Sequence, residues 1–162
     1  MDADNRRHLV TLLRRQRWAA LASVGGDGTP LASSVAYALH PEGHGFLLHL
    51  SRLAEHTRNL LQRGQASLVI GEPDRGEGDP QTLARFSVQG EAERLSPETH
   101  AFGSARAAYV ARLPDAEQRF AFADFELFLL TPSRGHFVGG FARAFPLDAS
   151  GVASVLKECV DA

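Results

Sequence analysis

Short polar turns between strand-like segments constrain the fold of this chain more than any other feature of its sequence. The apolar segment 18–24 ends at Gly25-Gly26-Asp27-Gly28, and the next strand-like segment runs from Pro30 to His40. Pro41-Glu42-Gly43 then leads into a third such segment over 45–50. Links of a few residues suit antiparallel hairpins, whereas parallel strands need long crossovers. The sequence therefore predicts an antiparallel barrel rather than a doubly wound parallel sheet.

The rest of the chain predicts further strands and flanking helices. Residues 85–94 alternate between apolar and polar side chains, which is typical of a half-exposed antiparallel strand, and Gly90 at its centre marks a place where a backbone or ligand comes close. The other expected elements are strands over 66–72, 125–130 and 135–138, and helices over 4–16, 53–63, 96–110 (capped by Ser96) and the chain end. We therefore predict one domain over residues 1–162, mainly β with flanking helices (α+β), built on an antiparallel barrel of six to seven strands.

Composition excludes several classes of function. The chain has 162 residues, 44% of them hydrophobic, and a formal net charge of −2, so no basic field predicts nucleic-acid binding. Its single cysteine, Cys159, excludes an internal disulfide and is expected to be a buried, inert thiol. The sequence shows neither a membrane-spanning apolar run nor a signal-peptide core, so we expect a cytoplasmic protein.

Hydrogen-bond donors gather where a strand leads into a helix. The segment 50–60 follows the apolar run 45–49 and contains Ser51, Arg52, His56, Thr57 and Asn59. The first turn of a helix has unpaired N–H groups and the positive end of the helix dipole, so such a turn favours an anion such as a phosphate monoester. The alternative is that Ser51 caps the helix and the other side chains are solvated surface.

Three segments together resemble a known family. They are residues 51–60 (SRLAEHTRNL), residues 88–95 (VQGEAERL) and residues 137–144 (FVGGFARA). They are similar to segments of the FMN-binding split barrels related to pyridoxamine 5′-phosphate oxidase, above all to the branch that includes heme-utilisation proteins. The resemblance extends from Trp18 to about Leu147.

This resemblance implies a split β-barrel of the FMN-binding type, which acts as a homodimer with FMN in a cleft between the subunits. The positions that match the family's cofactor contacts are Ala32, Ser33, Ser34 and Val35 along the flavin ring, Leu48 beside the ribityl chain, Ser51, Arg52, His56, Thr57 and Asn59 around the phosphate, Arg85 reaching across from the partner subunit, and Phe137 where the oxidase has a tryptophan.

Two departures from the family pattern bear on the substrate. Tyr37 stands where the oxidase has a lysine, and Phe145 stands where a substrate-facing Arg-x-His motif has its histidine, although Arg143 retains the arginine. Both departures argue against pyridoxamine 5′-phosphate as the substrate. We expect Tyr37 and Arg143 to face a flat or anionic small molecule instead.

Three functions follow from the resemblance. The first is an FMN-dependent oxidoreductase, in which the flavin exchanges a hydride and no catalytic side chain is assigned. The second is a heme-binding or heme-degrading protein that uses the same cleft, with His136 as the candidate axial ligand. The third is a flavin carrier without turnover.

One further cluster of ligand-type residues lies on a turn. His40, Glu42 and His44 are close in sequence, but side chains on a Pro/Gly turn need not converge. The sequence predicts a solvated turn there and no metal site.

Overall fold

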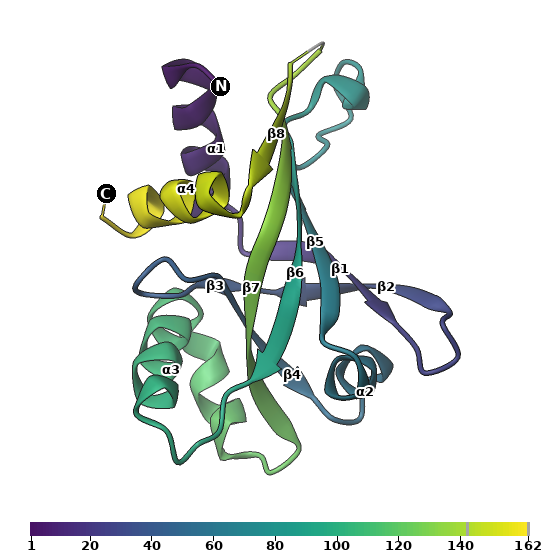
Figure 1. The fold of residues 1–162 in the computed structure, drawn as a ribbon, viewed down its shortest axis with the longest axis vertical. Helices are drawn as coiled ribbons and strands as arrows, with labels where there is room; N and C mark the ends of the chain where they lie inside the picture. The colour runs from purple at the N-terminus through teal and green to yellow at the C-terminus, as the bar shows by residue number, and fades with distance from the viewer. Residues whose placement is uncertain (142, 162) are drawn as a thin grey trace.

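Antiparallel strands form one strongly curled sheet in the computed structural model, which describes residues 1–141 and 143–161 (Figure 1). The strand order is β2-β1-β5-β6-β7-β4-β3, and β8 pairs with β7. The strands are β1 (Trp18–Val24), β2 (Pro30–Ala36), β3 (Ala38–Leu39), β4 (Phe46–Ser51), β5 (Gln65–Gly71), β6 (Arg85–Arg94), β7 (Phe125–Val138) and β8 (Ala144–Asp148). The predicted split-barrel architecture, α+β and antiparallel, is confirmed.

Within the described residues, four α-helices cover parts of this sheet. They are α1 (Ala3–Arg15), α2 (Glu55–Gln62), α3 (His100–Arg112) and α4 (Ala149–Asp161), and short 3₁₀ helices span Pro80–Thr82 and Pro114–Ala121. Figure 1 shows α1 and α4 together on one side of the upper sheet, with α3 and α2 near its lower end. None of the described helices combines the length and the apolarity needed to cross a membrane.

The main core lies between the inner face of the sheet and the helices α1 and α4. Leu9 and Leu13 of α1 and Val152 and Leu156 of α4 are essentially inaccessible to solvent, as the apolar spacing of both helices predicts. Cys159 belongs to this core, and burial raises the pKa of its thiol to about 12. It is therefore the inert thiol that the sequence predicts.

Several elements of the structure differ from the prediction, and the strand expected over 30–40 is divided into β2 and β3. The segments 125–130 and 135–138 form one continuous strand, β7, because Pro132 lies at a β-bulge, where β6 pairs with β7 on both sides of a register shift after Gln89. The helix expected from Ser96 begins at His100 instead, after a turn. The strand β8 was not predicted, because it has only five residues and contains Pro146, which disfavours a strand.

Candidate functional site

The strand-to-helix turn holds its donors in contacts within the protein. The Ser51 hydroxyl donates to Asp124 Oδ2 at 2.6 Å and accepts the Leu53 N–H at 3.2 Å. The helix α2 starts later, at Glu55, and its N-cap residue Ala54 provides no side-chain hydrogen bond. Ser51 therefore stabilises the turn before the helix, and its hydroxyl hydrogen is already donated to a carboxylate.

A buried carboxylate neutralises the arginine that was expected to bind phosphate. Glu126 on β7 is 6% exposed, forms an ion pair with Arg52, and accepts a hydrogen bond from Arg94 Nε at 2.6 Å. Asp124 accepts a hydrogen bond from the neighbouring Ser51, so two carboxylates line this turn. A phosphate dianion there would meet like charges, so the residues present do not fit the FMN phosphate at Ser51 and Arg52.

Two of the remaining predicted residues, Thr57 and Asn59 of α2, are buried. Asn59 donates from Nδ2 to the Ser23 hydroxyl at 3.2 Å and so joins α2 to β1. His56 is half-buried, and burial lowers its pKa. The hydroxyls of Thr57 and of Ser33 on β2 are buried without a hydrogen-bond partner among the described residues, and such groups usually bind water or a ligand.

We expect Glu126→Gln to free Arg52 for anions. The variant should lose about 1–2 kcal/mol of unfolding free energy, since the carboxylate is buried but both arginines are substantially exposed. Its affinity for FMN, followed by quenching of flavin fluorescence, should rise several-fold. The exposed Glu93 provides the control variant Glu93→Gln. An FMN affinity that is equal in wild type and Glu126→Gln would contradict this account of the turn.

The outer face of the sheet presents two continuous rows of side chains. Residue pairing across β2, β1, β5, β6 and β7 places Ala32, Ala22, Ser67, Gln89 and Arg134 in one row, and Ser34, Ala20, Val69, Ser87 and His136 in the other. We call these ten residues the open sheet face. All are exposed or partly exposed, and none is acidic. At one strand spacing per step, each row spans about 20 Å.

A shallow groove lies on this face. Its volume is 560 Å³, and its lining includes Ala22, Pro30, Ser67, Gln89 and Arg134. The small side chains of β1 and β5 leave the backbone accessible to a flat ligand or to another sheet. The sequence identifies Ala32, Ser34 and, for the heme alternative, His136 as ligand contacts. It does not identify the residues of β1 and β5, although both strands carry a detectable alternation of exposed and buried residues.

Three of the residues predicted to lie along the flavin have side chains buried in the core. Val35 and Leu48 are buried, with Leu48 fully inaccessible. Phe137 is also fully inaccessible and packs against the rings of His8 and Phe145, at centroid distances of 5.8 and 6.4 Å. The prediction that Phe137 contacts a flavin therefore gives way to a role in packing, because Phe137 points to the inner face of β7.

The two predicted substrate-facing residues are not brought together. Tyr37 is 1% exposed and donates its hydroxyl to the Leu13 carbonyl at 2.9 Å, and burial raises its pKa. Arg143 lies at the hairpin before β8, in a surface pocket that Asp2 and Asp4 also line. The prediction for Tyr37 is corrected on this point, since its hydroxyl joins the segment between β2 and β3 to α1.

The remaining candidates divide between the two ends of β7. Ser51 pairs with Phe125, the first residue of β7, and Arg85 pairs with Val138, the last. Roughly 40 Å of strand separates these ends. Arg85 is exposed and donates to the carbonyls of Gln81 and Leu83. One chain therefore does not unite Arg85 with α2, and the role of Arg85 toward a ligand held by a partner subunit stays a prediction.

Comparison with known proteins assigns the family. The family profile described as pyridoxamine 5′-phosphate oxidase matches residues 6–139. The chain belongs to this family. The resemblance seen in the sequence is thereby confirmed.

The relatives of this chain include proteins named for heme binding or heme oxygenase activity. The chloroplastic heme oxygenase HOZ of Arabidopsis thaliana is 32% identical over 119 residues, which cover 74% of this chain but only 35% of that protein. The heme oxygenase HutZ of Vibrio cholerae is 27% identical over 126 residues, covering 77% of this chain and 70% of HutZ. The structure of a heme-binding protein from Mycobacterium smegmatis superposes with a TM-score of 0.83 at 31% identity, covering 95% of this chain and 62% of that one.

Proposed function

We propose that this protein binds heme rather than FMN. Similarity to heme oxygenases and to a heme-binding protein supports this choice. The observation that carries it is the pairing of Ser51 with Asp124 and of Arg52 with Glu126, which would place two carboxylates beside an FMN phosphate. Heme has no phosphate, and its flat, largely apolar ring needs a flat surface of small residues.

The open sheet face is the surface that suits such a ring. Ala20 and Val69 offer apolar contacts at its centre, and His136 at one end of the same row offers an imidazole to iron. Arg134 ends the other row, within reach of a carboxylate such as a heme propionate. Bound heme would supply the iron that binds oxygen, while these residues would orient the ring.

A homodimer would complete this site. The open sheet face carries no carboxylate and one full charge, which favours burial against a second copy of the same face. A partner subunit would also exclude water from the ring and bring its own Arg85 toward the cleft. We propose an oxidoreductase that degrades heme in this cleft. A flavin-binding oxidoreductase or carrier is the alternative, and the unpartnered hydroxyls of Ser33 and Thr57 favour it.

We expect His136→Ala to weaken heme binding roughly tenfold or more, because the iron loses its axial nitrogen. Titration of the protein with hemin should give a Soret band at about 400 nm whose position shifts in the variant. His100→Ala, at the exposed start of α3, is the matched control and should behave as wild type. An unchanged Soret band and affinity in His136→Ala would exclude His136 as the ligand.

Turnover is tested separately with the heme complex. Addition of a reductant under air should bleach the Soret band and release iron to a chelating dye, faster than for free hemin. A protein that ignores hemin but saturates with FMN, with a flavin band at about 450 nm, would overturn the proposal in favour of the flavin alternative.

A further inference from the structure

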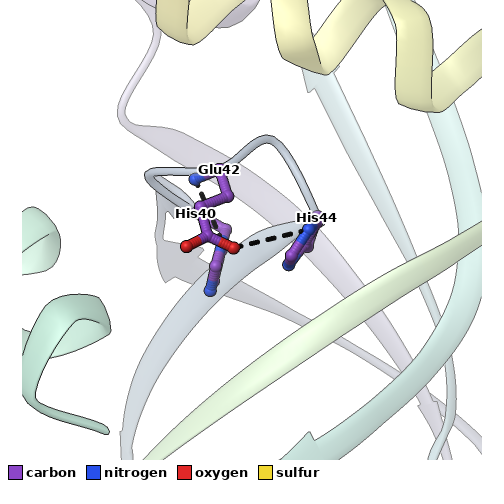
Figure 2. Close-up of side chains that lie close together, drawn as sticks. All are labelled: His40, Glu42 and His44. Carbon is purple, nitrogen blue, oxygen red and sulfur yellow. Dashed lines mark hydrogen bonds and ion pairs between the residues drawn. The ribbon is translucent and has the colours of Figure 1, made fainter. Parts of the chain in front are cut away.

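The turn between β3 and β4 gathers two imidazoles and a carboxylate. His40 follows β3 and is 6% exposed, whereas Glu42 and His44 are exposed on the turn itself. Figure 2 shows the three side chains directed toward the same small region beside the turn. The sequence predicts a solvated turn with no such convergence, and the structure brings the three residues together.

The distances suit a shared ion. One ligand atom from each of His40, Glu42 and His44 can be chosen so that all three lie within 4.8 Å of one another. His44 Nε2 lies 3.6 Å from Glu42 Oε2, and the two imidazole rings are stacked with centroids 4.8 Å apart. Ligand atoms bound to one tetrahedral ion are about 3.3 Å apart, given bond lengths of about 2.0 Å. Side-chain rotations alone can close the remaining difference.

The backbone of the turn is fixed before any ion binds. His40 N–H donates to the Gly45 carbonyl at 2.9 Å, and Gly43 N–H donates to the His40 carbonyl at 2.8 Å. Gly43 adopts a φ of +73°, and a Cβ there would lie 2.9 Å from the backbone nitrogen of Lys157 on α4. The turn therefore rests against α4 with no space for a side chain at Gly43. A fixed turn lowers the entropy that ordering the ligands would cost.

We propose that His40, Glu42 and His44 bind a divalent first-row transition-metal ion such as Zn²⁺. Two imidazoles and one carboxylate are the donor types that Zn²⁺, Ni²⁺ and Fe²⁺ accept, whereas Mg²⁺ and Ca²⁺ prefer oxygen ligands throughout. The backbone N–H of Glu42 donates to His40 Nδ1 at 3.2 Å, a long hydrogen bond. Coordination by His40 rearranges this one contact and leaves the rest of the turn unchanged.

Three protein ligands leave a position open on the ion. A groove of 460 Å³ adjoins the turn, because His44 lines it together with Leu129, Pro132, Ala153 and Leu156. Water or a small ligand with an apolar body can enter from this side. This site is separate in sequence and in chemistry from the open sheet face, so it does not depend on the proposed heme binding.

The test uses tag-free protein, without heme and freed of metal by a chelator. Zn²⁺ binding is measured by calorimetry, and Co²⁺ is used as a visible probe of coordination geometry. We expect one ion per chain, and an affinity at least tenfold weaker in Glu42→Gln and in His44→Gln. Both replaced side chains are exposed, so the fold is retained, and the exposed His100 provides the control variant His100→Gln, which should bind as wild type does.

Each other outcome overturns the proposal. The absence of saturable one-to-one binding up to about 1 mM Zn²⁺ would exclude a site of useful affinity. Equal binding in wild type and both variants would place the ion elsewhere. Loss of affinity in only one of the two variants would exclude a site with these three ligands. A Co²⁺ complex with the spectrum of the aqueous ion would exclude direct coordination.

Discussion

Gly90→Ala is expected to destabilise the protein by about 3 kcal/mol or more, a cost at the upper end for overpacking. A Cβ at Gly90 would lie 2.1 Å from the Thr131 carbonyl oxygen and 3.0 Å from Pro132 Cα. These are backbone atoms of β7, and β6 is also held on its other side, where Gly90 pairs with Ala66 of β5. Neither strand can withdraw, so urea unfolding should show a large drop in the transition midpoint.

The control for this experiment is a glycine with free space around it. A Cβ at Gly103 in α3 would meet no atom within 4 Å, so Gly103→Ala should stabilise the protein by about 0.5–1 kcal/mol through higher helix propensity. Comparable midpoints for the two variants would show that close approach at the bulge is not what requires Gly90.

The sequence predicted the regular strands because their periodicity is local. The strand β6 has the bounds expected from its alternation, and β1 likewise, because one face of each is buried and the other is open. The glycine inside β6 was correctly taken as a point of close approach. What approaches is the backbone at Thr131, however, and Pro132 occupies the bulge opposite Gly90.

The candidate site was harder to predict because its decisive contacts are distant in sequence. Ser51 and Arg52 do lie at the predicted turn. However, Ser51 donates a hydrogen bond to Asp124 and Arg52 forms an ion pair with Glu126, and both carboxylates are more than 70 residues away in sequence. No local pattern reveals which carboxylate a strand pairing will bring to a donor. The open sheet face likewise depends on the register of five strands, and a sequence gives the alternation of each strand but not their alignment.

A buried histidine beneath α3 gives the second large effect. His49 on β4 is 8% exposed, and its ring stacks on Phe120 with centroids 3.7 Å apart and planes 8° from parallel. Its Nδ1 has no hydrogen-bond partner among the described residues. Burial, together with the charges of Arg119 and Arg106, lowers the pKa of His49 to about 4, and the opposing effect of Glu126 is smaller.

This pKa makes the protein sensitive to acid in a defined range. In the unfolded chain His49 has its ordinary pKa of 6.5, so it is protonated below that pH. In the folded protein His49 stays neutral until the pH falls to about 4. The contribution of His49 to the unfolding free energy is therefore fully present above pH 6.5. It falls by about 3 kcal/mol as the pH decreases to 4, at 1.36 kcal/mol per pKa unit.

We expect His49→Phe to remove this part of the acid sensitivity. The variant keeps a ring to stack on Phe120 but has no group to protonate, and any packing cost is the same at every pH. The carboxylates and the other histidines contribute equally to wild type and variant. The quantity to measure is therefore the difference between the unfolding free energies of the two proteins, determined in urea at pH 7 and at pH 4.5. That difference should shift in favour of His49→Phe by about 2–3 kcal/mol on acidification. Parallel pH profiles would mean that the folded protein accommodates the charged ring, and that His49 is not the group that limits stability in acid.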